Sequence, residues 1–358
     1  MTRARTNANV TAAVGRNMII NGAMNVAQRS ASVTGLGAAE GYFTLDRFLI
    51  SPNATAGRLT MSQTADGPNG ISANCLKLDC TTADTSIASG EVLNIQHRFE
   101  GQNLQRIGKG VAGAKQITVS FYVKASAAFT FGVELFDSDN NRQITKLFDT
   151  TTDWVRHEIT FPADVDDGSS PFDDDNAVSL FLLFWLHAGA TYTGGTLNTA
   201  SWANYTNANR AVGIDSFFSN TANNFFLTGV QMEIGPVATE FEQEDIGVTL
   251  GKCERYFQKW DVPATVAAGV WFNADLTLGD LHFRQVMRAA PTMSVSSADF
   301  VKVYYQGAAI NANDSSPFDI ININSARFNL DMASSGTAGQ GALFQTNASE
   351  YIHVDAEL

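Results

Sequence analysis

The stretch Phe225–Phe241, FFLTGVQMEIGPVATEF, marks where the main β domain of this chain ends. Its first half alternates apolar and polar residues, which predicts a strand with one buried face. The alternation slips at Gly229, and a glycine inside a strand pattern predicts a bulge or bend. Gly235 and Pro236 then end the strand, because proline cannot donate to a ladder and glycine permits the turn.

A helix is predicted directly after this stretch, over Asp245–Trp260. Ile246, Leu250, Cys253 and Phe257 recur at helical spacing on one face. Asp245 stands where an N-cap residue is preferred. We therefore expect a helix that links the first β domain to whatever follows it.

The sequence before this point predicts repeated antiparallel strands. Ile117–Ala125 and Phe129–Phe136 both alternate cleanly, and turn signals recur about every ten residues, as in sandwiches and jelly rolls. Val178–Leu186 is the most apolar strand and is expected at the centre of a sheet, buried on both faces. Further strands are predicted over Gln143–Phe148 and Trp154–Phe161. Because helices and strands do not alternate, an α/β fold is disfavoured.

The sequence after the helix predicts a second, smaller β unit. At about 95 residues it is small to bury its own surface, so oligomerisation is an obvious aid. A Gly-rich turn is expected over Ser334–Gly341. The strands expected here are Gly269–Leu278, Leu281–Met287, Met293–Val295, Phe300–Tyr305, Asp319–Ile323, Ala326–Met332 and Tyr351–Asp355.

Composition and charge exclude several classes of function. The net charge of −13 disfavours nucleic-acid backbones and anionic membrane surfaces as partners. No apolar run approaches the roughly 20 residues of a spanning helix, and Met1–Arg16 does not resemble a signal peptide. Cys75 and Cys80 would point to opposite faces of one strand, and the count of three cysteines is odd, so a reduced protein assembled in cytoplasm is expected.

Enzymatic motifs are missing from the sequence. It has no GxSxG elbow, no HExxH, no phosphate-binding loop and no dinucleotide fingerprint. The five histidines are scattered, and His157 and His353 are interpreted as ordinary strand residues. Glu134 and Glu158 lie on predicted strands and are expected to face solvent. We therefore expect a protein that is not an enzyme.

Calcium is the one metal that the sequence suggests. Hard oxygen ligands are plentiful in the acidic loop that follows Phe161, although a solvated loop without an ion is the favoured interpretation. The candidate ligands there are Asp164, Asp166, Asp167, Asp173, Asp174 and Asp175. The shorter run from Asp137 to Arg142 lacks the glycine and the final glutamate of a calcium loop, and it is interpreted as a hairpin turn.

A long polar excursion, 187–222, offers residues suited to glycans. Sugars stack on exposed aromatic rings while amides bond their hydroxyl groups. The candidates are Trp202, Tyr192, Tyr205, Asn198, Asn204 and Asn207. The alternative is that Trp202 caps the sandwich core, and that alternative is favoured.

Three short motifs resemble those of bacteriophage tail-fibre-like and appendage proteins. They are NMIINGAMNVAQRS (Asn17–Ser30) with GYFTLDRF (Gly41–Phe48), the Gly-Pro-VATEFE-helix-CERYF run, and the final YIHVDAEL. The resemblance implies a jelly-roll domain like a carbohydrate-binding module, a homotrimer, and a place in the virion after assembly in the host cytoplasm. The trimer contact is expected on the C-terminal domain or the helix face.

Together these features predict an all-β fold. The expected parts are an N-terminal attachment arm over 1–15, a jelly-roll sandwich over 16–243, a linking helix over 244–260 and a C-terminal β domain over 261–358. Arg3 and Arg5 in the arm are expected to dock onto other virion proteins of the tail or capsid. The predicted function is that of a non-enzymatic tail-fibre or appendage protein that binds host-surface polysaccharide. The alternative is a capsid decoration or head-fibre protein, and a more distant one is a polysaccharide depolymerase.

Overall fold

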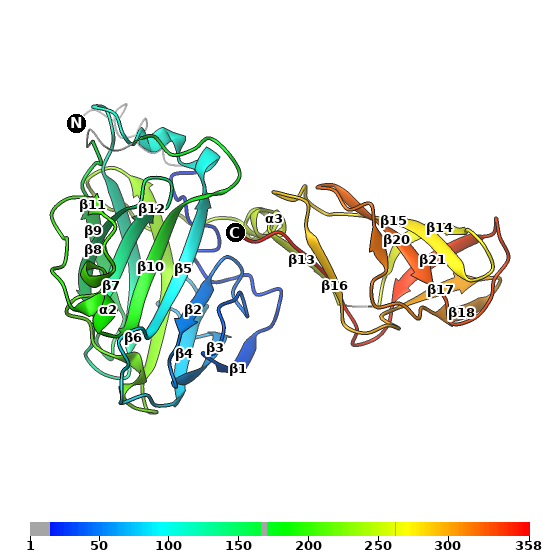
Figure 1. Ribbon diagram of the computed structural model, residues 1–358, viewed down its shortest axis with the longest axis horizontal. Helices are drawn as coiled ribbons and strands as arrows, with labels where there is room; N and C mark the ends of the chain where they lie inside the picture. Colours follow the sequence, from blue (N-terminus) through cyan, green and yellow to red (C-terminus); the bar gives the residue numbers. More distant parts are fainter. Residues whose placement is uncertain (1–14, 166–169, 262) are drawn as a thin grey trace. The chain divides into compact units, whose positions relative to one another are not determined.

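A computed structural model describes residues 15–165, 170–261 and 263–358. The chain is all-β and forms two compact units, Met1–Thr249 with Leu358 and Leu250–Glu357, here called the sandwich unit and the C-terminal unit (Figure 1). Its helices are short, namely α2 (Ala190–Thr193), α3 (Ile246–Glu254) and the 3-10 turns Gly101–Asn103, Gln105–Ile107, Asn207–Asn209 and Phe217–Ser219. None of the helices in the described part of the chain is long and apolar enough to cross a membrane.

The sandwich unit is a jelly roll of two six-stranded antiparallel sheets. The first sheet has the order β1-β3-β4-β12-β6-β9, with β1 (Ser32–Leu36), β3 (Arg58–Thr64), β4 (Cys75–Thr82), β12 (Asn224–Ile234), β6 (Ile117–Ala125) and β9 (Val155–Phe161). The second has the order β11-β8-β7-β10-β5-β2, with β11 (Ala203–Asn204), β8 (Arg142–Asp149), β7 (Thr130–Asp137), β10 (Val178–Ala188), β5 (Val92–Glu100) and β2 (Leu49–Asn53).

The main core fills the space between these two sheets. Alternate residues of each strand enter it, as the period of two requires. Phe121 on β6 packs edge-on against Phe184 on β10, with ring centroids 5.0 Å apart. As predicted, β10 lies inside its sheet, between β7 and β5. Part of its other face is also covered, because Leu183 and Trp185 belong to a second apolar cluster outside the sandwich core.

The predicted bulge in β12 is confirmed. Pairing of β12 with β6 shifts register between Thr228 and Gln231, and Gly229 has a φ of 59°. A side chain at Gly229 would meet Tyr122 and Ile71 at 2.8 Å, so only glycine fits this backbone. The three cysteines are free and buried, as expected from their spacing.

The N-terminal sequence motif builds a fixed corner of the sandwich unit. Asn21 adopts a φ of 63°, is buried, and donates a hydrogen bond to the Asp46 carbonyl. Gly22 lies so close to β12 that a Cβ atom would stand 2.1 Å from the Val230 carbonyl oxygen. The Asp46 carboxylate accepts hydrogen bonds from the Gln28 backbone and side chain. The turn and the Gln-Arg and Asp-Arg pairs of the sequence are therefore parts of one packed structure.

The predicted helix over Asp245–Trp260 is too long by two turns. Asp245 does cap it, since its carboxylate accepts a hydrogen bond from the Gly247 amide at 2.8 Å. The helix ends at Glu254, and Phe257–Trp260 is the strand β13, paired with β22. The apolar spacing continued past the helix because Phe257 and Trp260 are buried strand residues. Of the residues expected on one helix face, Ile246 and Leu250 are exposed and Cys253 is buried.

The C-terminal unit contains two antiparallel sheets. The smaller has the order β13-β22-β16, with β13 (Phe257–Trp260), β22 (Ile352–Asp355) and β16 (Thr292–Val295). The larger has the order β18-β17-β21-β14-β15-β20-β19, with β18 (Ala308–Asn311), β17 (Val301–Tyr305), β21 (Gly341–Thr346), β14 (Thr265–Trp271), β15 (Leu276–His282), β20 (Ser325–Asp331) and β19 (Phe318–Asp319).

Strand boundaries in the C-terminal unit differ from several predictions. The predicted strand Gly269–Leu278 spans the turn of the β14–β15 hairpin, and the predicted strand Leu281–Met287 ends at His282. Phe272 and Leu276 close the turn through a backbone hydrogen bond. The predicted strand Asp319–Ile323 is mostly loop. Short strands with polar faces carry too few apolar residues to set their own limits.

Candidate functional site

The outer face of the second sheet of the sandwich unit carries an unusual row of side chains. Direct pairing across four strands places Arg98 of β5, Phe181 of β10, Phe136 of β7 and Gln143 of β8 side by side. Residues directly opposite in antiparallel strands share a face. The core-facing neighbours of these residues, such as Leu135 of β7, point the other way. The row therefore lies on the surface opposite the sandwich core.

Three aromatic rings of this surface form a continuous stripe, here called the aromatic row: Phe181, Phe136 and Tyr205. The centroids of Phe181 and Phe136 lie 5.6 Å apart, and those of Phe136 and Tyr205 lie 5.0 Å apart. The Arg98 guanidinium lies 5.3 Å from the Phe181 centroid at one end. Both phenylalanines are partly exposed, and Tyr205 is 37% exposed. Phe136 and Phe181 also pack against the buried cluster around Trp185, so the aromatic row is a partly exposed apolar patch and a candidate binding surface.

Tyr205 is held in place by hydrogen bonds on both sides. The Gln143 side-chain amide donates to the Thr206 carbonyl and accepts from the Thr206 amide. The Tyr205 backbone amide donates to the Asn141 carbonyl at 2.7 Å. Its hydroxyl donates to Asn207 Oδ1 at 2.6 Å and accepts from Arg210. These contacts fix the ring before any ligand arrives, which reduces the entropy lost on binding.

A buried ion pair supports the aromatic row from one side. The Arg210 guanidinium bonds both oxygens of the Glu134 carboxylate, with Nε to Oε1 at 2.9 Å and Nη2 to Oε2 at 2.9 Å. Trp185 Nε1 donates to the same carboxylate at 2.7 Å. The guanidinium also lies about 5 Å from the rings of Phe136 and Tyr205. It thus connects the second sheet to the segment that carries Tyr205.

The expectation that Glu134 faces solvent is wrong. Its side chain is fully buried and its charge is balanced by Arg210. The long excursion after β10 folds back over the sheet and covers this position. A carboxylate enclosed in this way has no access to a substrate, so it does not supply the catalytic acid of a glycosidase.

The structure divides the six predicted glycan-binding residues. Trp202 is 7% exposed, belongs to the sandwich core and donates its Nε1–H to the Pro162 carbonyl. Its role as a ligand platform is therefore wrong, and the alternative, a cap on the core, is confirmed. Tyr192 packs on Trp185, with the two ring centroids 5.5 Å apart. Asn204 and Asn207 flank Tyr205, and the Asn198 carbonyl accepts from the Thr145 amide.

The described candidate calcium ligands of the acidic loop do not come together, in keeping with the favoured interpretation of a solvated loop. The Asp164 carboxylate is buried and bonds Arg142 through both oxygens at 2.7 Å, with Lys109 Nζ at 3.5 Å. Its charge is therefore neutralised by protein cations. Among the described residues of this loop, Asp173, Asp174 and Asp175 are exposed and join no group of three metal ligands. Asp166 and Asp167 lie outside the described residues, as do Arg3 and Arg5 of the predicted attachment arm.

The turn after β7 is a hairpin, as predicted. The Asp137 carboxylate accepts hydrogen bonds from the Asp139 and Asn140 amides. Lys109 Nζ lies 2.6 Å from the same carboxylate. These bonds close the connection between β7 and β8 and hold Gln143 at the end of the aromatic row.

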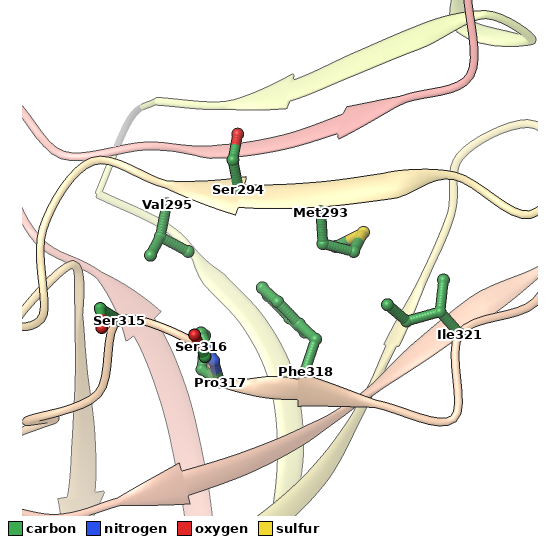
Figure 2. A pocket seen from close by; sticks show the side chains of 8 residues that line it. All are labelled: Met293, Ser294, Val295, Ser315, Ser316, Pro317, Phe318 and Ile321. Atoms are coloured by element: carbon green, nitrogen blue, oxygen red, sulfur yellow. The ribbon is translucent and has the colours of Figure 1, made fainter.

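The C-terminal unit has a separate small hollow of about 150 Å³. Figure 2 shows Met293 and Val295 of β16 directed toward Phe318, with Ser294 pointing away from them. The remaining lining residues are Ser315, Ser316, Pro317 and Ile321. This volume is below the roughly 300 Å³ at which small-molecule sites begin. The lining carries no charged side chain, so the aromatic row is the stronger candidate site.

Comparison with known proteins gives only distant structural similarities. No family model matches the sequence, and no curated protein matches it either. Among solved structures, the chain is similar to a family 11 carbohydrate-binding module from Clostridium thermocellum in complex with a β-1,3-1,4-mixed-linked tetrasaccharide. The identity is 12% and the TM-score 0.28, over 59% of this chain and 99% of that chain.

Two further solved structures have similar values. A family 61 carbohydrate-binding module in complex with β-1,4-galactotriose has 10% identity and a TM-score of 0.29, over 62% of this chain and 99% of that chain. A family 30 carbohydrate-binding module has 9% identity and a TM-score of 0.26, over 63% of this chain and 97% of that chain. The function of this chain is therefore argued from its own side chains.

Sequence reasoning missed Phe136 and Phe181 as surface residues. The pattern of Phe129–Phe136 assigned Phe131, Val133 and Leu135 to one face, which leaves Phe136 on the opposite face. A phenylalanine there was the available signal. Phe181 gave no such signal, because Leu180–Leu186 is apolar at every position.

Proposed function

We propose that this protein is a non-enzymatic structural component of a bacteriophage virion, placed on a tail fibre or appendage, and that its sandwich unit binds host-surface glycans. The aromatic row is the observation that carries the binding function. The virion location rests on the resemblance of the short sequence motifs at Asn17–Phe48 and at the end of the sandwich.

The chemistry of the aromatic row suits a chain of sugar units. The ring faces of Phe136, Phe181 and Tyr205 offer apolar surface for the C–H faces of pyranoses. Arg98, Asn204 and Asn207 border the rings with donors and acceptors for hydroxyl groups. The spacing of the rings, 5.0 and 5.6 Å between neighbours, makes one stripe rather than isolated contacts. A linear polysaccharide lying across the strands would cover all three.

The proposed role needs no catalysis. Glu134, the buried acid of β7 beside the aromatic row, is enclosed by Arg210 and Trp185. The net charge of −13 favours neutral or cationic glycans over strongly acidic ones. A homotrimer would present three such surfaces, and multivalent contact raises the apparent affinity for a repetitive polysaccharide.

Binding of the purified protein to intact host cells and to extracted surface polysaccharide tests this proposal. We expect Phe181→Ala and Tyr205→Ala each to weaken polysaccharide binding by about fivefold to tenfold, or ~1 kcal/mol, because each removes one stacking surface. Val286→Ala is the control, since Val286 is an exposed apolar residue, 51% exposed, in the C-terminal unit and outside the aromatic row. Circular dichroism establishes that each variant is folded.

Three results would contradict the proposal in different ways. Equal binding by wild type and both variants would remove the aromatic row as the site. Binding only to virions that lack the protein would favour a capsid decoration protein over an adhesin. Release of new reducing ends from the polysaccharide would show a depolymerase.

A further inference from the structure

A cluster of three ionisable side chains lies apart from the aromatic row. Asp84 follows β4, Glu91 precedes β5, and His187 lies near the end of β10. One potential ligand atom from each residue lies within 4.8 Å of the other two. The side chains are buried, with 5%, 4% and 0% of their residues exposed, respectively. Three separate segments of the sandwich unit therefore converge on one point.

The two carboxylates of this cluster lack a cationic partner of the usual kind. Within the described residues, neither Asp84 nor Glu91 pairs with a lysine or an arginine, whereas buried Glu134 pairs with Arg210. The Asp84 carboxylate accepts hydrogen bonds from the Thr55 hydroxyl at 2.9 Å and the Ala56 amide at 2.8 Å. Two buried carboxylates cost free energy unless a cation balances them.

The geometry around His187 matches that of a metal ligand. Its Nδ1 lies 2.7 Å from Ser216 Oγ, which fixes the ring and leaves Nε2 facing the carboxylates. Nε2 and Glu91 Oε2 are 3.2 Å apart. Two ligand atoms of one tetrahedral zinc ion lie about 3.4 Å apart when each bond is about 2.1 Å. A histidine ligand whose second nitrogen is bonded to a neighbouring group is the usual arrangement.

We propose that Asp84, Glu91 and His187 form a binding site for one divalent transition-metal ion, with Zn²⁺ the best match. An imidazole nitrogen and carboxylate oxygens are ligand types that zinc accepts, and water can complete the tetrahedron. Calcium fits less well, because it requires six to eight oxygen ligands. The metal would join the β4–β5 connection to β10, and through Ser216 to the end of the excursion that carries Tyr205.

Titration calorimetry of the full chain with ZnCl₂ tests this site. We expect saturable binding of one Zn²⁺ per chain and a higher unfolding temperature with zinc than with EDTA. Glu91→Gln keeps an acceptor for His187 but removes the charged ligand, and His187→Gln removes the nitrogen. Both should weaken zinc binding by more than the roughly 10- to 100-fold expected for loss of a supporting residue such as Ser216. Exposed His282 supplies the matched control, His282→Gln, which should bind zinc like wild type.

Wild-type protein alone gives a second readout in case the variants fail to fold. Bound Co²⁺ should show visible absorption bands that one equivalent of Zn²⁺ abolishes. Hydrogen exchange should slow on zinc binding in the peptides covering Asp84–Glu91 and the end of β10. Absence of saturable zinc binding to wild type, protection confined to other peptides, or unchanged affinity in folded Glu91→Gln and His187→Gln would each overturn the proposal. The cluster would then be a hydrogen-bonded part of the core.

Discussion

The sandwich unit and the C-terminal unit are both antiparallel β structures, but they differ in how many ionisable residues they bury. Glu254 is the one buried acidic or basic residue of the C-terminal unit among the described residues, whereas the sandwich unit buries many. The buried ionisable residues there are Asp46, Arg47, Asp84, Glu91, His97, Glu100, Lys109, Glu134, Asp137, Arg142, Asp164, His187, Arg210 and Glu233.

The outer faces of the two units differ as well. In the sandwich unit, the excursion after β10 covers much of the second sheet and creates the enclosed space in which Glu134 and Arg210 pair. In the C-terminal unit, Val270, Tyr304 and Leu343 on one face of the larger sheet remain exposed. A covering segment thus turns a plain sheet face into a site with fixed charges and a defined edge of open aromatic rings.

The two units should differ most in the unfolding free energy that each loses when the acid of an ion pair is replaced. We expect Glu134→Gln to destabilise the sandwich unit by about 3–5 kcal/mol, because it leaves the Arg210 charge enclosed without a partner. Glu254→Gln should cost less than about 1 kcal/mol, because the Arg284 side chain is 44% exposed and water can solvate it. Denaturant unfolding, with hydrogen exchange to assign each transition to a unit, measures both. An equal loss of unfolding free energy in the two variants would contradict the conclusion that only the sandwich unit depends on an enclosed ion pair.

Lowering the pH should destabilise the sandwich unit through its histidines. Burial lowers the pKa of His97 well below its usual range, and the positive charge of Arg47 lowers it further. Burial likewise lowers the pKa of His187, although Glu91 opposes the shift. Because the unfolded chain binds these protons near pH 6.5 and the folded chain does not, stability is retained above that pH and falls below it.

The expected slope is up to about 1.4 kcal/mol per pH unit for each such group between roughly pH 6.5 and 5. Unfolding free energies measured across this range should fall for wild type and fall less for His97→Gln. His282→Gln serves as the control, because His282 is an exposed residue of the C-terminal unit. Stability that rises toward pH 5 would show that the sign is wrong.

The sequence predicted the sandwich better than its site, for a physical reason. Strands such as Ile117–Ala125 carry a period-two pattern over nine residues, and the structure places β6 at the same residues. The turn of the β7–β8 hairpin and the bulge at Gly229 also follow from local rules. Local patterns therefore predicted where these strands and turns lie along the chain, but not the order of the strands in the sheets.

The site depends on contacts between segments far apart in sequence. Glu134 and Arg210 are 76 residues apart, and Glu91 and His187 are 96 residues apart. No local pattern links them, so each acid was interpreted as solvent-facing or left unassigned. Trp202 also shows how little its sequence neighbours reveal. Those neighbours are polar and suggested a surface position, but the ring lies in the core. In the C-terminal unit, the short strands have weak sequence patterns, so several predicted strand boundaries differ from those of the structure.

The exposed face of the C-terminal unit gives the smallest expected change in folding stability. Phe272→Ser should alter the unfolding free energy of this unit by less than about 0.5 kcal/mol, because Phe272 is 62% exposed. The expected homotrimer makes a further prediction. Removing an apolar ring beside Val270 and Leu343 should weaken self-association, which sedimentation velocity measures as a shift toward smaller species. Val286→Ser is the matched control, because Val286 is similarly exposed but lies in the connection between β15 and β16.

If Phe272→Ser and the control self-associate like wild type, this face is not the trimer contact. Another face of the C-terminal unit and the exposed apolar residues at the start of α3, Ile246 and Val248, are then the contacts to test next. If Phe272→Ser alone dissociates, the two units differ in what covers the outer face of a sheet. The sandwich unit covers its outer sheet face with its own chain, and the C-terminal unit covers the corresponding face with a second copy.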